Sequence, residues 1–210
     1  KTYSSWSLRP WVLMKHFGIP FEEILVKLDL PETAQEIRQY SPSGKVPALL
    51  DGDSVIWESL AIMEYLNEQF PGKKMYPADS LERAYARSIA NEMHGGFADM
   101  RKHMSFHSKK RFDNFDFTPA LKDIERVKAI WTEALARSGG PFLMGDFSIA
   151  DAMYAPVVGR FQTYGVPVQN EIEDYCDRIL TLPAVLEWYQ GALVEDFVAP
   201  DHEAMSQGFI

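Results

Sequence analysis

The sequence predicts two domains, a mixed α/β domain over residues 1–77 and an all-helical domain over residues 78–210. In the first part, short runs rich in β-forming residues alternate with helical apolar patterns. From residue 79 onward, almost every segment shows helical spacing of its apolar residues. The stretch 73–78 between the two parts begins with two lysines and contains a proline, and we expect it to be a linker.

Composition narrows the class of protein. The chain has 46% hydrophobic and 24% charged residues, as an ordinary globular protein does, and its net charge of −9 argues against nucleic acid or an anionic membrane as a partner. No apolar run approaches the roughly 18 to 20 residues of a membrane span. The single Cys176 leaves no internal disulfide and fits a reducing compartment, and no signal peptide is evident. We therefore expect a cytoplasmic protein.

The first domain lacks a strand that its pattern requires. Its expected elements are, in order, a helix over 10–17, a strand over 21–28, a helix over 31–40, a hairpin over 46–57 and a helix over 60–70. Pro10 suits a first helical turn, and Asp51-Gly52 is a strong hairpin signal. A β-α-β unit also needs a strand before its first helix, so we expect the natural protein to carry several residues upstream of Lys1. With that strand restored, the order β-α-β-α-β-β-α is the thioredoxin-like pattern, a four-stranded mixed sheet covered by helices.

The second domain is expected to be helical throughout. A long helix runs from Leu81 into the region of Met104, and an aperiodic polar and aromatic stretch, 105–119, follows it. The next helix, over 119–138, has an apolar face made of Leu121, Ile124, Val127, Ile130, Trp131 and Leu135. Ser148 and Asp151 form a capping box that opens a helix through Tyr164. Two more helices are expected between residues 170 and 196.

Two dipeptides flank the hairpin and are candidates for binding a peptide. Pro47 has no N–H to donate to a β-ladder, so it should stand at the start or the edge of a strand. If the Val46-Pro47 bond is cis, it would turn the Val46 backbone outward. That backbone could then bind an extended peptide by main-chain hydrogen bonds. Glu58 and Ser59 stand at a helix N-terminus, where N–H groups and the dipole favour an anion. An ordinary hairpin that leads into a helix is the alternative.

The seryl hydroxyls before the first helix have two interpretations. In the run Ser4-Ser5-Trp6-Ser7, a hydroxyl can simply cap the N–H groups of the helix. The functional alternative is that the hydroxyl donates a hydrogen bond to a thiol sulfur, which stabilises the thiolate and lowers the thiol pKa. The residues alone leave both open.

These motifs in this order, together with the capping box, resemble the glutathione transferase superfamily from Ser4 to about residue 188. The resemblance implies a glutathione-binding thioredoxin-like domain and a helical domain that binds a hydrophobic electrophile, usually within a homodimer. In that family the Val-Pro dipeptide pairs with the cysteinyl backbone of glutathione, and the Glu-Ser pair holds its γ-glutamyl end. By position these are Val46-Pro47 and Glu58-Ser59, and Lys45 would reach the glycyl carboxylate.

The first helix is similar to that of the bacterial serine-type, zeta- and theta-like, transferases. Ser4 matches the zeta catalytic serine, Ser5 stands beside it, and Arg9 matches an arginine that is usually structural. Trp6 departs from the pattern because zeta proteins have cysteine there, which puts maleylacetoacetate isomerase activity in doubt. Trp6 would instead narrow or wall the electrophile pocket, or be simply a half-buried aromatic.

Candidates in the long helix are weaker. In relatives this region borders the substrate pocket, so His94, Phe97, Met100 and Arg101 are candidates for contacting the electrophile. His103 and His107 are four residues apart, but without a cysteine partner we expect a solvated surface there and no metal site.

The function that the resemblance implies is activation of the glutathione thiol for attack on an electrophilic small molecule, as in detoxification. One alternative is another glutathione-dependent enzyme on the same scaffold, either a cis-trans isomerase or a peroxidase or disulfide reductase. The other is a non-catalytic protein-interaction module. Glutathione is expected as co-substrate and no metal is expected.

Overall fold

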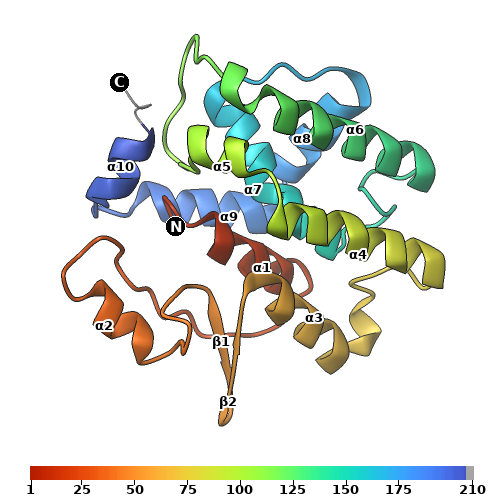
Figure 1. Ribbon diagram of the computed structural model, residues 1–210. Helices are drawn as coiled ribbons and strands as arrows, with labels where there is room; N and C mark the ends of the chain where they lie inside the picture. The colour runs from red at the N-terminus through yellow and green to blue at the C-terminus, as the bar shows by residue number, and fades with distance from the viewer. Residues whose placement is uncertain (207–210) are drawn as a thin grey trace.

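A small α/β part is followed by a larger helical part in the computed structural model, which describes residues 1–206 (Figure 1). The expected order of a mixed α/β domain and an all-helical domain is confirmed. The α/β part contains α1 (Ser5–His16), α2 (Thr33–Arg38), β1 (Ala48–Asp51), β2 (Ser54–Trp57) and α3 (Ser59–Gln69). The end of the expected second domain, 207–210, lies outside the described residues.

The helical part contains α4 (Ser80–Gly95), α5 (Ala98–His103), α6 (Leu121–Ser138), α7 (Ile149–Tyr164), α8 (Asn170–Leu180), α9 (Pro183–Leu193) and α10 (Pro200–Ser206). Short 3-10 turns, Pro71–Lys73 and Thr118–Ala120, precede α4 and α6. Within residues 1–206, no helix is both long and apolar enough to cross a membrane.

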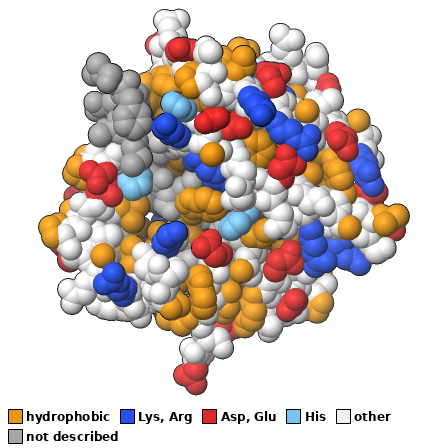
Figure 2. Space-filling view, in the orientation of Figure 1, with side chains coloured by type: hydrophobic (Ala, Val, Ile, Leu, Met, Phe, Trp, Pro, Cys, Tyr) orange, Lys and Arg blue, Asp and Glu red, His pale blue; other side chains and the backbone are white. Residues whose placement is uncertain are grey.

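The hairpin is confirmed. β1 and β2 pair antiparallel, with Asp51 opposite Ser54, so Gly52 and Asp53 form the turn between them. Gly52 has φ 56°, a conformation that glycine adopts without steric cost. The hairpin projects at the bottom of Figure 1, and acidic side chains lie at its tip in Figure 2.

The expected strand over 21–28 and the four-stranded sheet are not found in the described chain. The segment belongs to no strand, and the sheet consists of β1 and β2 alone. A cavity of about 760 Å³ separates the segment from β1, and apolar side chains such as Trp11, Phe21 and Leu49 line it. Ladder pairing needs backbones about 4.8 Å apart, so a segment on the other side of this cavity from β1 does not pair with it.

α1 begins earlier than expected and joins the two parts. Ser4 caps the helix, so Pro10 lies inside it and not in its first turn. Pro10 has no N–H and therefore leaves out one helical hydrogen bond. α1 packs against α3 on one side and against α7 and α9 on the other, so it lies at the junction of the two parts (Figure 1).

The long helix expected from Leu81 to Met104 is broken into α4 and α5. Gly95 ends α4, and Phe97 has left-handed backbone angles, φ 61° and ψ 46°. Arg101 donates from Nε to the Gly96 carbonyl at 3.0 Å and also bonds the Met93 carbonyl. These bonds satisfy carbonyls that the end of a helix leaves without partners.

The expected capping box is present at the start of α7. Asp151 accepts hydrogen bonds from the Ser148 N–H at 2.9 Å and from the Leu143 N–H at 3.0 Å. The apolar face of α6 is also confirmed, except that Leu121, the first residue of the helix, is 44% exposed.

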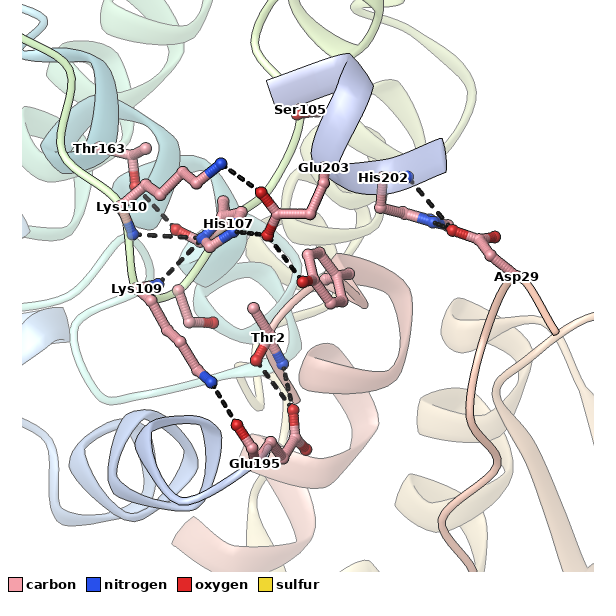
Figure 3. A network of polar contacts seen from close by, with 12 residues as sticks. Thr2, Asp29, Ser105, His107, Lys109, Lys110, Thr163, Glu195, His202 and Glu203 are labelled. Carbon is pink, nitrogen blue, oxygen red and sulfur yellow. Dashed lines mark hydrogen bonds and ion pairs between the residues drawn. The ribbon is translucent and has the colours of Figure 1, made fainter. Parts of the chain in front are cut away.

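The C-terminal helix α10 was not expected from the sequence. Glu203 on α10 accepts hydrogen bonds from Tyr3 Oη at 2.7 Å and from Lys110, and lies 2.9 Å from His107 Nε2 (Figure 3). His107 is 2% exposed, so the solvated surface expected around it is wrong. The same network includes a contact of 2.7 Å between His202 and Asp29.

Candidate functional site

The first helix turn places two serines differently. Ser4 Oγ accepts a hydrogen bond from the Ser7 N–H at 3.2 Å and donates to Ser7 Oγ at 2.9 Å, so the capping interpretation is confirmed. Ser5 is 4% exposed and accepts a hydrogen bond from Arg160 Nη2 at 3.3 Å. Ser4 is only half-buried, so its hydroxyl is the more accessible of the two.

Val46 and Ser4 lie at one cavity. The Val46-Pro47 bond is cis, and Val46, Ser4 and Ser7 line a cavity of about 160 Å³. Lys45, directly before them, is exposed. The structure therefore brings the expected thiol-activating hydroxyl and the expected peptide-reading residue to the same cavity, although more than forty positions separate them in the sequence.

The N-terminus of α3 combines backbone strain with an unpartnered hydroxyl. Glu58 has φ 70° and ψ 128°, angles that a residue with a side chain rarely adopts. Ser59 is fully buried, and its Oγ has no hydrogen-bond partner among the described residues. Sequence reasoning selected both residues but missed the strain, which depends on how β2 and α3 are joined in space.

His94 connects Glu58 to the first helix. Its Nε2 is 3.7 Å from a Glu58 carboxylate oxygen, and its ring lies edge-on to Trp6 with the ring centres 5.4 Å apart. Burial lowers the His94 pKa, Glu58 opposes that shift, and the charges of Arg9 and Arg101 add to it. His94 and Trp6 thus form one continuous wall beside the α3 N-terminus.

Two arginines stack on Trp6. The guanidinium carbon of Arg9 is 4.3 Å from the Trp6 ring centre, and that of Arg101 is 4.5 Å from it. The structure thus brings together three of the weaker candidates for contacting the electrophile, Trp6, His94 and Arg101. The other two, Phe97 and Met100, are buried in the hydrophobic core.

Sequence reasoning missed Arg160. It lies on α7, where nearly every residue is buried, and it donates to the Met104 carbonyl at 2.8 Å. Burial, together with the charge of Arg101, lowers its pKa to about 9. A lone arginine within an otherwise apolar helix was the signal in the sequence that could have revealed it.

Within the part of the chain that the structure describes, no group of three or more His, Cys, Asp or Glu side chains could hold a metal ion. The side chains gathered around α1 and α3 are hydroxyls, guanidinium groups, an imidazole and a carboxylate. Such groups can position an anionic peptide and stabilise a thiolate by hydrogen bonds.

Two family profiles match the chain. Residues 3–69 match the N-terminal domain of glutathione S-transferase, and residues 82–191 match its C-terminal domain. Among curated relatives, glutathione S-transferase L1 of Arabidopsis thaliana is 27% identical over 87% of this chain and 71% of its own. A probable maleylacetoacetate isomerase 2 of Drosophila melanogaster is 29% identical over 79% of this chain and 73% of its own.

Solved structures agree on the fold. Glutathione transferase Omega 3C from Trametes versicolor has a TM-score of 0.72 and 20% identity, and the match covers 97% of this chain and 86% of that one. A glutathione transferase homologue from Burkholderia, solved with bound glutathione, has a TM-score of 0.67 and 24% identity over 91% of this chain and 94% of its own. The N-terminal part is thus a thioredoxin-like transferase domain with few strands, and the chain belongs to the glutathione S-transferase family.

Proposed function

We propose that the protein is a glutathione transferase in which the Ser4 hydroxyl stabilises the glutathione thiolate. The observation that carries this proposal is the position of Ser4 and Val46 at one cavity. The N-terminus of α3, which bears Glu58 and the unpartnered Ser59 hydroxyl, supports it. A hydrogen bond to sulfur favours the charged form of the thiol and so lowers its pKa. The thiol proton passes to solvent, and the thiolate forms a bond to an electrophilic carbon. The bond from that carbon to a leaving group such as a halide breaks, and the leaving group departs with the electron pair.

Each expected binding residue has a role in this proposal. The Val46 backbone, which lines the same cavity as Ser4, pairs with the cysteinyl unit of glutathione. The unpartnered Ser59 hydroxyl and the N–H groups of α3 bind the γ-glutamyl carboxylate, and Glu58 accepts from its ammonium group. Exposed Lys45 assists at the glycyl carboxylate.

Ser4 is a better candidate than Ser5 because of exposure. Ser5 is buried, and its hydroxyl already accepts a hydrogen bond from Arg160 on α7. This bond connects the first residue of α1 to α7. The half-buried Ser4 hydroxyl donates a hydrogen bond to Ser7 Oγ in the free protein. It can give up this hydrogen bond and donate to the glutathione sulfur instead.

A glutathione-dependent cis-trans isomerase is the second candidate, and the similarity to a probable maleylacetoacetate isomerase favours it. Trp6 stands where the serine-type isomerases have cysteine, which argues for the transferase. Assays with a cis-configured unsaturated acid, with a halogenated aromatic and with a peroxide separate isomerase, transferase and peroxidase activity. A detoxifying role, a homodimer and a cytoplasmic location stay predictions.

The proposal is tested by calorimetric titration with glutathione, combined with the ultraviolet absorbance of the bound thiolate. We expect the wild-type protein to bind glutathione and to show the thiolate, and Ser4→Ala to bind with the thiolate signal lost and kcat lowered about 10²-fold. Ser5→Ala should retain the signal. Ser88→Ala is the matched control, because Ser88 is exposed on α4 and bonds only its own helix.

No binding at millimolar glutathione would remove the enzyme proposal and leave a non-catalytic interaction module. Loss of the thiolate in Ser5→Ala, with Ser4→Ala unaffected, would instead assign the role to Ser5.

A further inference from the structure

Two buried arginines and one partly buried arginine converge behind the candidate site. Arg9 comes from α1, Arg101 from α5 and Arg160 from α7, and Arg9 and Arg160 are 0% and 4% exposed. Their charges act on one another, since the charge of Arg101 lowers the pKa of both Arg9 and Arg160, after burial as the main cause. Like charges held together away from water are costly unless an opposite charge joins them.

No carboxylate of the described residues forms an ion pair with any of the three. Arg9 Nε donates to the Met153 carbonyl at 3.0 Å, and the bonds of Arg101 go to carbonyls at the end of α4. Burial lowers the pKa of Arg101, and the charge of Asp123 opposes that shift. The Asp123 carboxylate, however, accepts a hydrogen bond from the Met100 N–H at 2.9 Å.

Several donors remain without a hydrogen-bond partner within the described part of the chain. They are Nη1 and Nη2 of Arg9 and Nη1 of Arg101, all three buried. A buried donor on a charged group that lacks a partner costs free energy, and an acceptor that arrives with negative charge removes that cost. Arg9 is completely buried, so its two unpartnered nitrogens form a built site and not a surface patch.

These donors lie beside Trp6, in the first turn of the helix that Ser4 caps. Both guanidinium groups lie within 4.5 Å of the Trp6 ring centre, and Trp6 follows Ser4 by two positions. Trp6 and Arg101 are partly exposed, whereas Arg9 lies deeper. A group that approaches along Trp6 therefore meets an aromatic surface first and unpaired guanidinium donors behind it.

We propose that Arg9 and Arg101 form a carboxylate subsite beside Trp6, and that the preferred electrophile carries an acidic group which binds there. This inference rests on the proposed transferase function and names its substrate class. A guanidinium group matches the planar geometry of a carboxylate, and Trp6 covers the apolar body of the same molecule. The carboxylate belongs to the electrophile, and the test below distinguishes it from a carboxylate of glutathione itself.

The test compares two electrophiles with the same alkene and ketone, 3-benzoylacrylate and its ethyl ester, in which the ethyl group removes the negative charge. In both, the thiolate sulfur bonds to the alkene carbon β to the ketone, the alkene electron pair moves to form the enolate, and the enolate takes a proton from water. We expect the KM of the acid to be about 10-fold or more below that of the ester. Equal KM values for acid and ester would overturn the subsite and leave the transferase proposal intact.

The Arg101→Gln variant links the preference to the cluster. We expect it to raise the KM of the acid about 10-fold and to leave the KM of the ester and of glutathione unchanged, while Arg101→Lys recovers part of the loss. A rise in the KM of glutathione instead would overturn the inference, because the subsite would then hold a carboxylate of glutathione. Arg126→Gln is the control, since Arg126 is exposed and pairs with Glu92.

A binding measurement keeps the inference testable if Arg101→Gln fails to fold or if no turnover occurs. The unreactive saturated acid, 3-benzoylpropionate, is titrated into the wild-type protein and compared with its ethyl ester. Tighter binding of the acid supports the subsite even without turnover, and equal binding overturns it. Absence of glutathione binding in the same protein would reject the proposed transferase function separately.

Discussion

Asp151 is the residue whose contacts hold the start of α7 in place. It is fully buried, and burial raises its pKa to about 6 although the Leu143 N–H and the Ser148 hydroxyl and N–H favour its charged form. Replacement by asparagine keeps the volume, but its NH₂ group faces donors that need an acceptor. The capping box could be predicted from Ser148 and Asp151 because it depends on four consecutive residues only.

We expect Asp151→Asn to lower the free energy of unfolding by about 2 kcal/mol, because a buried cap is lost and an N–H is left without a partner. Urea unfolding monitored by tryptophan fluorescence measures it. Asp146→Asn is the control because Asp146 is exposed, and an equal loss in both variants would contradict the assigned role.

Glu203 is the residue that ties α10 to the first part of the chain. Burial alone raises its pKa, but hydrogen bonds from Lys110, His107 and Tyr3 outweigh burial and bring the pKa down to about 2. A carboxyl group whose pKa is lower in the folded state stabilises that state above its unfolded pKa, and this contribution is lost as pH falls through the folded pKa.

For this reason we expect Glu203→Gln to lower the thermal midpoint most at neutral pH. The difference from wild type should shrink between pH 4.5 and pH 2, the interval between the ordinary and the folded pKa. Thermal scans across that range measure it, with Glu171→Gln, an exposed change on α8, as the control. A difference that does not depend on pH would show that the charge of Glu203 is not what stabilises α10.

At the scale of elements, the hairpin was predictable and the strand over 21–28 was not. The hairpin depends on its own turn, where Gly52 takes a left-handed conformation, so nearby residues determine it. A β-strand forms only where a neighbouring strand can pair with it. Between residues 21–28 and the open edge of β1, the place of such a neighbour is taken by the cavity of about 760 Å³. The helix break at Phe97 was not predicted either, because Phe97 takes left-handed backbone angles that a residue with a side chain rarely adopts. Arg101, four positions further on, bonds the Gly96 carbonyl there.

The strand that we expected ahead of α1 therefore stays a prediction, and it belongs to this scale. An extended apolar segment would fit the cavity. It would pair with residues 21–28 on one side and with the open edge of β1 on the other. We expect a chain with several natural residues before Lys1 to have a higher thermal midpoint than the chain of 210 residues, and to protect amides of 21–28 from hydrogen exchange. Mass spectrometry that finds Lys1 at the natural N-terminus would contradict this expectation.

At the scale of the whole molecule, the expected homodimer also remains to be tested. The hairpin exposes Leu50, Val55 and Trp57 at 46%, 36% and 45%, which gives this part of the surface an apolar face. We expect light scattering to give twice the 24.0 kDa mass of one chain, and Trp57→Glu to shift it toward one chain. A monomeric wild-type protein would contradict the expectation, which rests on the family resemblance.

The sequence by itself determined the order of the two parts, the hairpin and the capping box, because each depends on residues within a few positions of one another. It also supplied the candidate motifs for binding glutathione, which stay a prediction. Only the tertiary structure decided how α1 lies against α7, which serine is accessible, and how Arg9, Arg101 and Arg160 meet around Trp6. Those features depend on packing between segments up to about 150 positions apart, and on burial that leaves some charges without partners.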